Sequence, residues 1–387
     1  MKRQLLGVAA ILLSISTYAQ DNPLWMRYCA ISPDGTTIAF TYKGDIYTVP
    51  STGGRASQIT TNPAHDTKPI WSPDGKKIAF ASDRMGSMDI FEVNKEGGIP
   101  KRLTTHSGNE TPVAYKDAGH ILFLANIMPT AEDAQFPSGQ FQQVYEVNTE
   151  GGRPILFSSM PMEDISINHT GNTLLYHDKK GYEDPWRKHH TSSITRDIWL
   201  CSLNGNRTFR KQTAFNGEDR TPVWASDDKS FYYLSEEKGS FNIFKRDIDG
   251  NTSKQITNHT KHPVRFLSAA SNGTLCYGYD GEIYTVKEGA IPQKVQISIV
   301  TDKNDKDLIR QIKRSGATEI SLSPDAKEIA FVLRGDVYVT STEYSTTKQI
   351  TNTPQQERDI HFSPDGRSIV YASERNGLWQ IYQTSLA

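Results

Sequence analysis

The sequence is poor in several features that would each assign it to a class of protein. It has three cysteines, Cys29, Cys201 and Cys276, and an odd count at wide spacing is not a disulfide framework. Its formal net charge is −1, which provides no basic surface for nucleic acid. It also lacks the G-x-S-x-G motif that presents the nucleophile of α/β-hydrolases. We therefore expect three buried thiols, no nucleic-acid partner and no catalytic residue in this chain.

Long apolar runs are also scarce, and one of them stands at the N-terminus. Two basic residues precede an apolar run at residues 5–15, and Thr17-Tyr18-Ala19 follows it. A charged start, an apolar stretch too short to cross a bilayer and a small-x-small tripeptide are typical of a secretory signal peptide. We expect a signal peptide over residues 1–19, no membrane segment after it, and a periplasmic location.

What the chain has in abundance is one repeated hairpin. It reads I-W-S-P-D-G-K-K-I-A-F at residues 70–80, and close variants begin at Ile31, Leu322 and Phe362. Proline and aspartate at the two central positions favour a type I turn between two strands. Phe80 faces one side of the second strand and small alanines face the other, so we expect this strand to be covered on both sides.

Two further markers recur after each hairpin. A D-I-Y-like strand appears first at residues 45–47 and last at 380–382, and a Q-I-T-like strand appears first at 58–60. Each repeat therefore has four short strands at a period of about 40 residues, which is typical of a β-propeller blade. One aspartate recurs at the same place in the repeat, as Asp45, Asp89, Asp197 and Asp336. Recurrence at equivalent positions favours a structural role for these carboxylates.

The spacing of the repeats predicts an all-β fold in two parts. Six repeats precede a charged break at residues 298–317, and two repeats follow it. We expect a six-bladed β-propeller over residues 20–300, a linker at 301–317, and the first two blades of a second, incomplete propeller at 318–387. One eight-bladed ring remains the alternative. Because the last repeat stops at Ala387 after its third strand, we expect this chain to be part of a longer polypeptide.

Insertions at residues 126–142 and 178–196 mark candidate binding loops. The candidate peptide-binding residues are Trp186, Arg187, Lys188, His189 and His190. Arginine matches a peptide carboxylate in a bidentate fashion, although Trp186 packing under its own loop is the alternative. The same insertion brings His177, Asp178, Glu183 and Asp184 close in sequence to these histidines. Without an H-x-x-x-H or H-E-x-x-H spacing we expect no metal and no cofactor.

The S-P-D-G hairpins with D-I-Y and I-T strands resemble the propeller repeats of TolB-type periplasmic proteins, prolyl-oligopeptidase-type enzymes and tricorn-type proteases. Six repeats, a break and renewed repeats are most similar to tricorn-type proteases, in which a six-bladed propeller precedes a seven-bladed one, PDZ and serine-peptidase domains. The resemblance covers residues 25–387 and includes G-E-D-R-T-P-V-W at 217–224. It implies the N-terminal propeller region of a secreted bacterial homologue.

The resemblance implies a role but transfers no site residue. In tricorn-type proteases an arginine pair on a first-propeller loop is thought to hold the substrate carboxylate, whereas the 126–142 insertion contains no arginine. Two functions stay open. One is a non-catalytic module that filters peptides and guides them to a peptidase domain outside this chain. The other is a stand-alone TolB-like periplasmic scaffold that binds another protein. The partner is thus a peptide or a protein, and the oligomeric state is open.

Overall fold

The computed structural model describes residues 23–126, 141–182, 184, 186, 192–300 and 314–386. These residues form strands and turns without a helix, and therefore without a helix able to cross a membrane. The chain divides into two compact units, Met1–Lys303 and Asn304–Ala387. The expected signal peptide and residues 301–313 of the expected linker lie outside the described residues.

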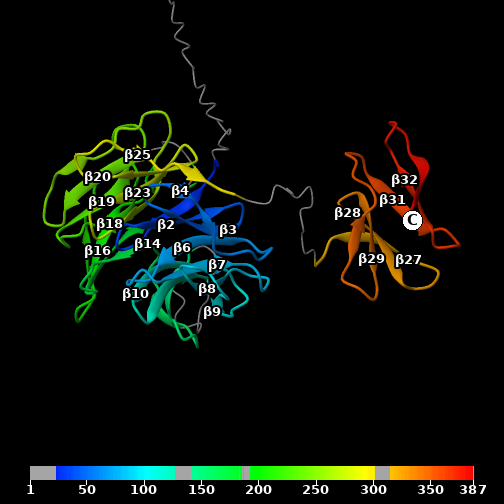
Figure 1. The fold of residues 1–387 in the computed structure, drawn as a ribbon, viewed down its shortest axis with the longest axis horizontal. Helices are drawn as coiled ribbons and strands as arrows, with labels where there is room; N and C mark the ends of the chain where they lie inside the picture. The colour runs from blue at the N-terminus through cyan, green and yellow to red at the C-terminus, as the bar shows by residue number, and fades with distance from the viewer. Residues whose placement is uncertain are drawn as a thin grey trace, which may run out of the picture. The chain divides into compact units, whose positions relative to one another are not determined.

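The first unit contains six four-stranded antiparallel sheets whose strands pair in chain order, with the short β4 (Gly54–Arg55) outside the first sheet (Figure 1). The first strands of the six blades are β1 (Arg27–Ile31), β6 (Asp66–Trp71), β10 (Glu110–Asp117), β14 (Met162–Ile167), β18 (Asp219–Trp224) and β22 (Arg265–Ala269). The second strands are β2 (Thr37–Tyr42), β7 (Lys77–Ser82), β11 (His120–Ala125), β15 (Thr173–Asp178), β19 (Ser230–Ser235) and β23 (Leu275–Tyr279). The third strands are β3 (Asp45–Pro50), β8 (Asp89–Asn94), β12 (Gln143–Asn148), β16 (Ile198–Ser202), β20 (Asn242–Asp247) and β24 (Glu282–Val286). The fourth strands are β5 (Ser57–Gln58), β9 (Lys101–Arg102), β13 (Ile155–Ser158), β17 (Thr208–Lys211), β21 (Ser253–Gln255) and β25 (Gln293–Lys294).

The second strand of a blade is buried on both faces, as the small alanines beside Phe80 predicted. Ile78, Ala79 and Phe80 are all completely buried. Phe80 stacks on Phe91 of β8 with ring centroids 6.1 Å apart. A blade cannot bury both of its faces alone, so these side chains fix each sheet between two neighbours.

In five of the blades a threonine at the end of the fourth-strand segment fastens the outer part of the blade. Thr60 Oγ1 accepts a hydrogen bond from the Ile46 N–H at 2.9 Å. The same bond joins Thr104 to Ile90, Thr213 to Ile198, Thr257 to Ile243 and Thr351 to Val337. The recurring aspartate belongs to this arrangement, because Asp45 accepts from Gln58 Nε2 at 3.0 Å and from Thr60 Oγ1 at 3.4 Å. Asp336 makes the equivalent contacts with Gln349 and Thr351, whereas Asp89 and Asp197 form ion pairs with Arg102 and Lys211.

The sixth blade meets the first, so the six sheets close on themselves. After blade six, β26 (Ile297–Ser298) pairs in parallel with β4 (Gly54–Arg55) beside blade one. The Met26 N–H also donates to Gly281 O at 3.1 Å. One hydrophobic cluster combines Phe40 of blade one with Cys276 of blade six. All three cysteines are buried and unpaired.

The second unit consists of two blades. Its strands are β27 (Ala317–Leu322), β28 (Glu328–Leu333), β29 (Asp336–Ser341) and β30 (Thr347–Gln349), then β31 (Glu357–Phe362), β32 (Ser368–Ser373) and β33 (Gln380–Ser385). The two sheets pack through one apolar cluster that includes Val332, Val337 and Tyr371. Ile320 and Leu322 on β27 are 76% and 57% exposed. The chain thus has the expected architecture of β-propeller blades, seven of them four-stranded and the last three-stranded among the described residues.

Candidate functional site

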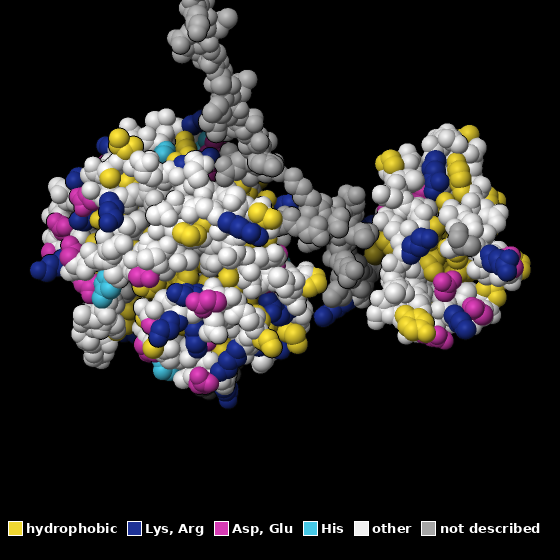
Figure 2. Space-filling view, in the orientation of Figure 1, with side chains coloured by type: hydrophobic (Ala, Val, Ile, Leu, Met, Phe, Trp, Pro, Cys, Tyr) yellow, Lys and Arg dark blue, Asp and Glu magenta, His cyan; other side chains and the backbone are white. Residues whose placement is uncertain are grey.

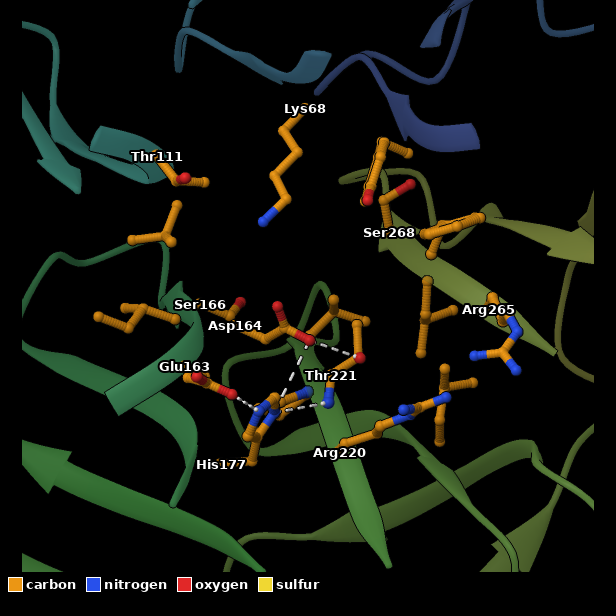
Figure 3. Close-up of a pocket in the computed structure, with 18 of the residues that line it drawn as sticks. Lys68, Thr111, Glu163, Asp164, Ser166, His177, Arg220, Thr221, Arg265 and Ser268 are labelled. Carbon is orange, nitrogen blue, oxygen red and sulfur yellow. Dashed lines mark hydrogen bonds and ion pairs between the residues drawn. The ribbon is translucent and has the colours of Figure 1, made fainter. Parts of the chain in front are cut away.

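A cavity of about 720 Å³ lies among the first strands of all six blades of the first unit (Figure 3). Each of these strands contributes lining residues, among them Tyr28, Lys68, Pro112, Asp164, Thr221 and Phe266. The volume is in the range of about 300–1,000 Å³ that is usual for ligand pockets. By contrast, the face of the first unit seen in Figure 2 carries interspersed side chains of both signs. The cavity is therefore the candidate functional site of the first unit.

A β-bulge in each first strand shapes the cavity wall. The pairing of β1 with β2 shifts register between Arg27 and Ala30, and equivalent shifts occur in the other five blades. In five blades a bulge residue has positive φ without being glycine: Tyr28 (52°), Lys68 (54°), Asp164 (48°), Thr221 (52°) and Phe266 (57°). Left-handed backbone costs such residues about 1–2 kcal/mol, so the packed blades must hold it in place. Bulges re-aim side chains, and these five all line the cavity.

Sequence reasoning missed this wall, although a signal for it was present. Pro69, Pro112 and Pro222 stand inside the first strands of blades two, three and five. Proline cannot donate to a strand ladder, so within a sheet it marks an edge strand or a bulge. Here it marks both.

One side of the cavity carries an acidic pair held by hydrogen bonds. His177 Nδ1 accepts from the Thr221 N–H at 3.3 Å, and Nε2 lies 3.2 Å from Glu163 Oε2. This arrangement assigns the ring proton to Nε2, which donates it to Glu163. Lys179 Nζ contacts the other Glu163 oxygen at 2.7 Å. Burial acts to raise the pKa of Glu163, but the contacts with His177 and Lys179 outweigh it and hold that pKa well below its usual value.

Asp164 is the more accessible acid of the pair. Its Oδ2 accepts from Thr221 Oγ1 at 2.7 Å, and its side chain is 49% exposed. Figure 3 places Lys68 across the open space from Asp164, with its amino group directed into the cavity. No ion-pair partner is present for Lys68 among the described residues. The cavity therefore presents opposite charges on opposite sides.

A buried ionic group supports the wall behind the acidic pair. Arg196 Nη1 lies 2.9 Å from Glu218 Oε1, and Arg220 Nη1 lies 3.5 Å from the same oxygen. The Arg220 guanidinium also sits 4.1 Å from the ring centre of Phe241. Burial lowers the pKa of Arg220 to about 10. Because removing one partner of a buried ion pair leaves an uncompensated charge, this group is best understood as structural.

Trp186 forms an aromatic and cationic side together with blades one and six. The guanidinium carbons of Arg27 and Arg265 lie 4.8 Å and 5.1 Å from the Trp186 ring centre. Phe266 meets the same ring edge-on at 6.1 Å, and its own ring lies 4.8 Å from that of Tyr28. Burial is the main cause that lowers the pKa of Arg265, and the charge of Arg27 adds to it. Trp186 thus contacts other blades rather than only its own loop.

Of the five predicted peptide-binding residues, only Trp186 can be placed, and it lines the cavity. Arg187, Lys188, His189 and His190 lie outside the described residues, so their role stays a prediction. Asp178, considered for a metal, instead accepts from the Asp197 N–H at 2.8 Å and from Trp199 Nε1 at 3.1 Å. Within the described ranges no group of three or more histidine, cysteine or acidic side chains is arranged to hold a metal ion.

Comparison with known families decides where this propeller belongs. Residues 23–290 match the family model described as the tricorn protease N-terminal beta propeller domain. The chain belongs to the tricorn N-terminal β-propeller family. It is 24% identical to "Tricorn protease homolog 1" of Streptomyces coelicolor over 365 residues, and 27% identical to "Tricorn protease homolog" of Saccharolobus solfataricus over 295 residues. Among solved structures it is similar to the tricorn protease crystal structure, with a TM-score of 0.60, 18% identity and coverage of 94% of this chain.

This tricorn-type propeller chain is short beside its relatives. It spans 32% and 26% of the two curated homologues, and 36% of the solved tricorn chain. The match covers most of this chain, at 92% and 73% of its length for the two homologues. The shared part is therefore the propeller region, and the chain is a propeller module associated with tricorn-type proteases.

Proposed function

We propose that this propeller is a non-catalytic module that filters and guides extended peptides toward a peptidase domain outside this chain. The observation that carries the proposal is the cavity lined by the first strands of all six blades. A folded domain of about 100 residues has a radius of gyration of about 13 Å, so it cannot enter a cavity of about 720 Å³. An extended peptide can enter, and the bulged inner strands offer it charged, aromatic and backbone contacts.

Peptide binding tests this function directly. A fluorescein-labelled unstructured peptide should show saturable binding by anisotropy, and a small folded protein with the same label should not. Val113→Trp places an indole inside the cavity and should weaken peptide binding about tenfold or more while the melting temperature stays close to that of the parent. Met85→Trp is the matched control, because Met85 is 58% exposed. Undiminished binding by Val113→Trp would argue against the cavity as the peptide site.

The same proposal includes the absence of hydrolysis by the purified chain. Peptide and ester substrates should remain intact after prolonged incubation. Turnover that survives repurification and disappears with one Ser→Ala substitution would overturn this part of the proposal.

Export to the periplasm is the remaining part, and it rests on the charged and apolar character of residues 1–19. Mass spectrometry of the exported protein should find a mature N-terminus at Gln20. Exported protein that retains Met1 would contradict the cleavage.

A further inference from the structure

A bulge in the second unit shows what this repeated backbone feature can bind. Glu319 Oε2 of β27 accepts hydrogen bonds from the N–H groups of Asp359 and Ile360 in β31, at 2.7 Å and 3.4 Å. Asp359 is the bulge residue of β31 and has φ 56°. Two successive N–H groups that turn toward one anion form a nest, which is a known anion-binding arrangement. In this protein, a bulge of this kind receives a carboxylate from the preceding blade.

The same bulge recurs where blades six and one of the first unit meet. Tyr28 and Phe266 have φ 52° and 57°, and each lies four residues before its turn, as Asp359 does. The residue that corresponds to Glu319 for the bulge of β1 is Phe266, which contacts Tyr28 through its ring. An aromatic ring therefore stands here in place of the carboxylate. The bulge of β1 has no acid from the preceding blade at that position.

Two arginines lie close to this particular bulge, on Trp186. Arg27 immediately precedes it, and Arg265 holds the same place in blade six. Their guanidinium groups flank Trp186, and Arg265 Nη2 also donates to Trp186 O at 2.7 Å. Asp184 is the acid whose charge acts most strongly on Arg265, whereas Arg27 has no ion-paired carboxylate among the described residues. A carboxylate between Arg27 and the bulge would meet a guanidinium fork as well as backbone donors.

We propose that the seam between blades six and one is a carboxylate subsite of the cavity. Its ligand is an extended peptide that carries an acidic side chain or a free C-terminal carboxylate. Arg27 and the β1 bulge bind the anion, and Trp186, Tyr28 and Phe266 contact the neighbouring residues of the peptide. This inference rests on the proposed peptide-guiding function and adds a preference to it.

Three labelled peptides test the subsite. The first is acetylated and amidated Ala-Ala-Glu-Ala-Ala, the second has glutamine in place of glutamate, and the third is acetylated penta-alanine with a free C-terminal carboxylate. The glutamate peptide should bind about tenfold or more tightly than the glutamine peptide, because charge-assisted hydrogen bonds are lost with the carboxylate. An equal gain for the third peptide identifies the chain terminus as a second source of the same anion.

Two pairs of variants locate the effect. Arg27→Gln should bring the glutamate-to-glutamine affinity ratio close to one, whereas Arg153→Gln, at an exposed position in blade three, should leave it unchanged. Phe266→Glu supplies the carboxylate from within the chain, as Glu319 does, and should abolish the preference. Phe266→Gln makes a similar change in size without the charge and should retain it.

The outcomes separate the subsite from the general function. Equal binding of the glutamate and glutamine peptides by the parent protein would overturn the subsite and leave the cavity as a peptide site. A preference that persists in both Arg27→Gln and Phe266→Glu would place the anion elsewhere and also overturn it. If no peptide bound at all, the proposed function and the subsite would both be wrong.

Discussion

Ring closure can be tested at a single glycine. Gly53 has φ 90°, and a Cβ added there would lie 2.6 Å from the carbonyl oxygen of Gln296, which follows blade six. Gly53→Ala should therefore cost about 1–2 kcal/mol for the left-handed backbone alone. It should also displace the β26–β4 pair. The bonds from Gly54 N to Gln296 O and from Ala56 N to Ser298 O are 2.8 Å and 2.9 Å long. Losing both adds about 1–3 kcal/mol.

The matched control is Gly97→Ala in the equivalent turn of blade two. Gly97 has φ 94°, but its nearest neighbour to an added Cβ is Ile59 O at 3.7 Å, an ordinary contact. Both variants bear the conformational cost, and only Gly53→Ala also disturbs the closure. Urea denaturation gives the two free energies of unfolding, and hydrogen exchange should show lost protection at residues 293–298 in Gly53→Ala alone. Equal free energies, with unchanged exchange at 293–298, would refute the account of closure.

Three further predictions concern stability. Phe80→Ala should lower the free energy of unfolding in denaturant by about 3–5 kcal/mol, because Phe80 is completely buried. Ile99→Ala is the control: its side chain is 98% exposed, so the change should stay within about 0.5 kcal/mol. Comparable losses in the two variants would contradict the blade packing. Ala326 has φ 60°, a left-handed backbone that strains alanine but not glycine. Ala326→Gly should therefore stabilise the second unit by about 0.5–1 kcal/mol in a thermal melt. A loss of stability would show that the backbone at this position is not strained. Burial raises the pKa of Asp219 to about 7, so the folded state binds the extra proton and this carboxyl lowers stability as pH rises from about 4 to about 7. Asp219→Asn should remove that part of the slope in urea titrations across this range, and an unchanged slope would contradict the raised pKa.

The turns show how far local sequence reaches. The Ser32 hydroxyl donates to Asp34 Oδ1 at 2.6 Å and accepts from the Thr37 N–H at 3.0 Å, all within six residues of chain. The hydrogen bond from Ser32 is the main cause that lowers the pKa of Asp34. Because every partner is a near neighbour in sequence, the S-P-D-G pattern could predict the hairpin wherever it occurs. The Asp-Ser pair repeats in the turns at residues 72–74, 323–325 and 363–365.

The candidate site shows where such reasoning ends. Trp186 could be selected from its insertion, but its partners Arg27 and Arg265 come from blades one and six and are distant in sequence. In the sequence, two widely separated arginines look like ordinary surface residues, and only the closed ring brings both to Trp186. The acidic side is similar, since His177 of β15 joins Glu163 of β14 to Thr221 of β18 across two blades.

The sequence by itself determined the period, the four strands of a blade and the burial of Phe80, since turn chemistry and strand alternation act over a few residues. Only the tertiary structure decided which first-strand residues enter the cavity. A bulge adds one residue to a strand and reverses the faces of those around it, so alternation alone cannot place Tyr28 or Phe266. Closure then sets the seam, because blades one and six are the most distant in sequence and become neighbours only when all six blades have packed.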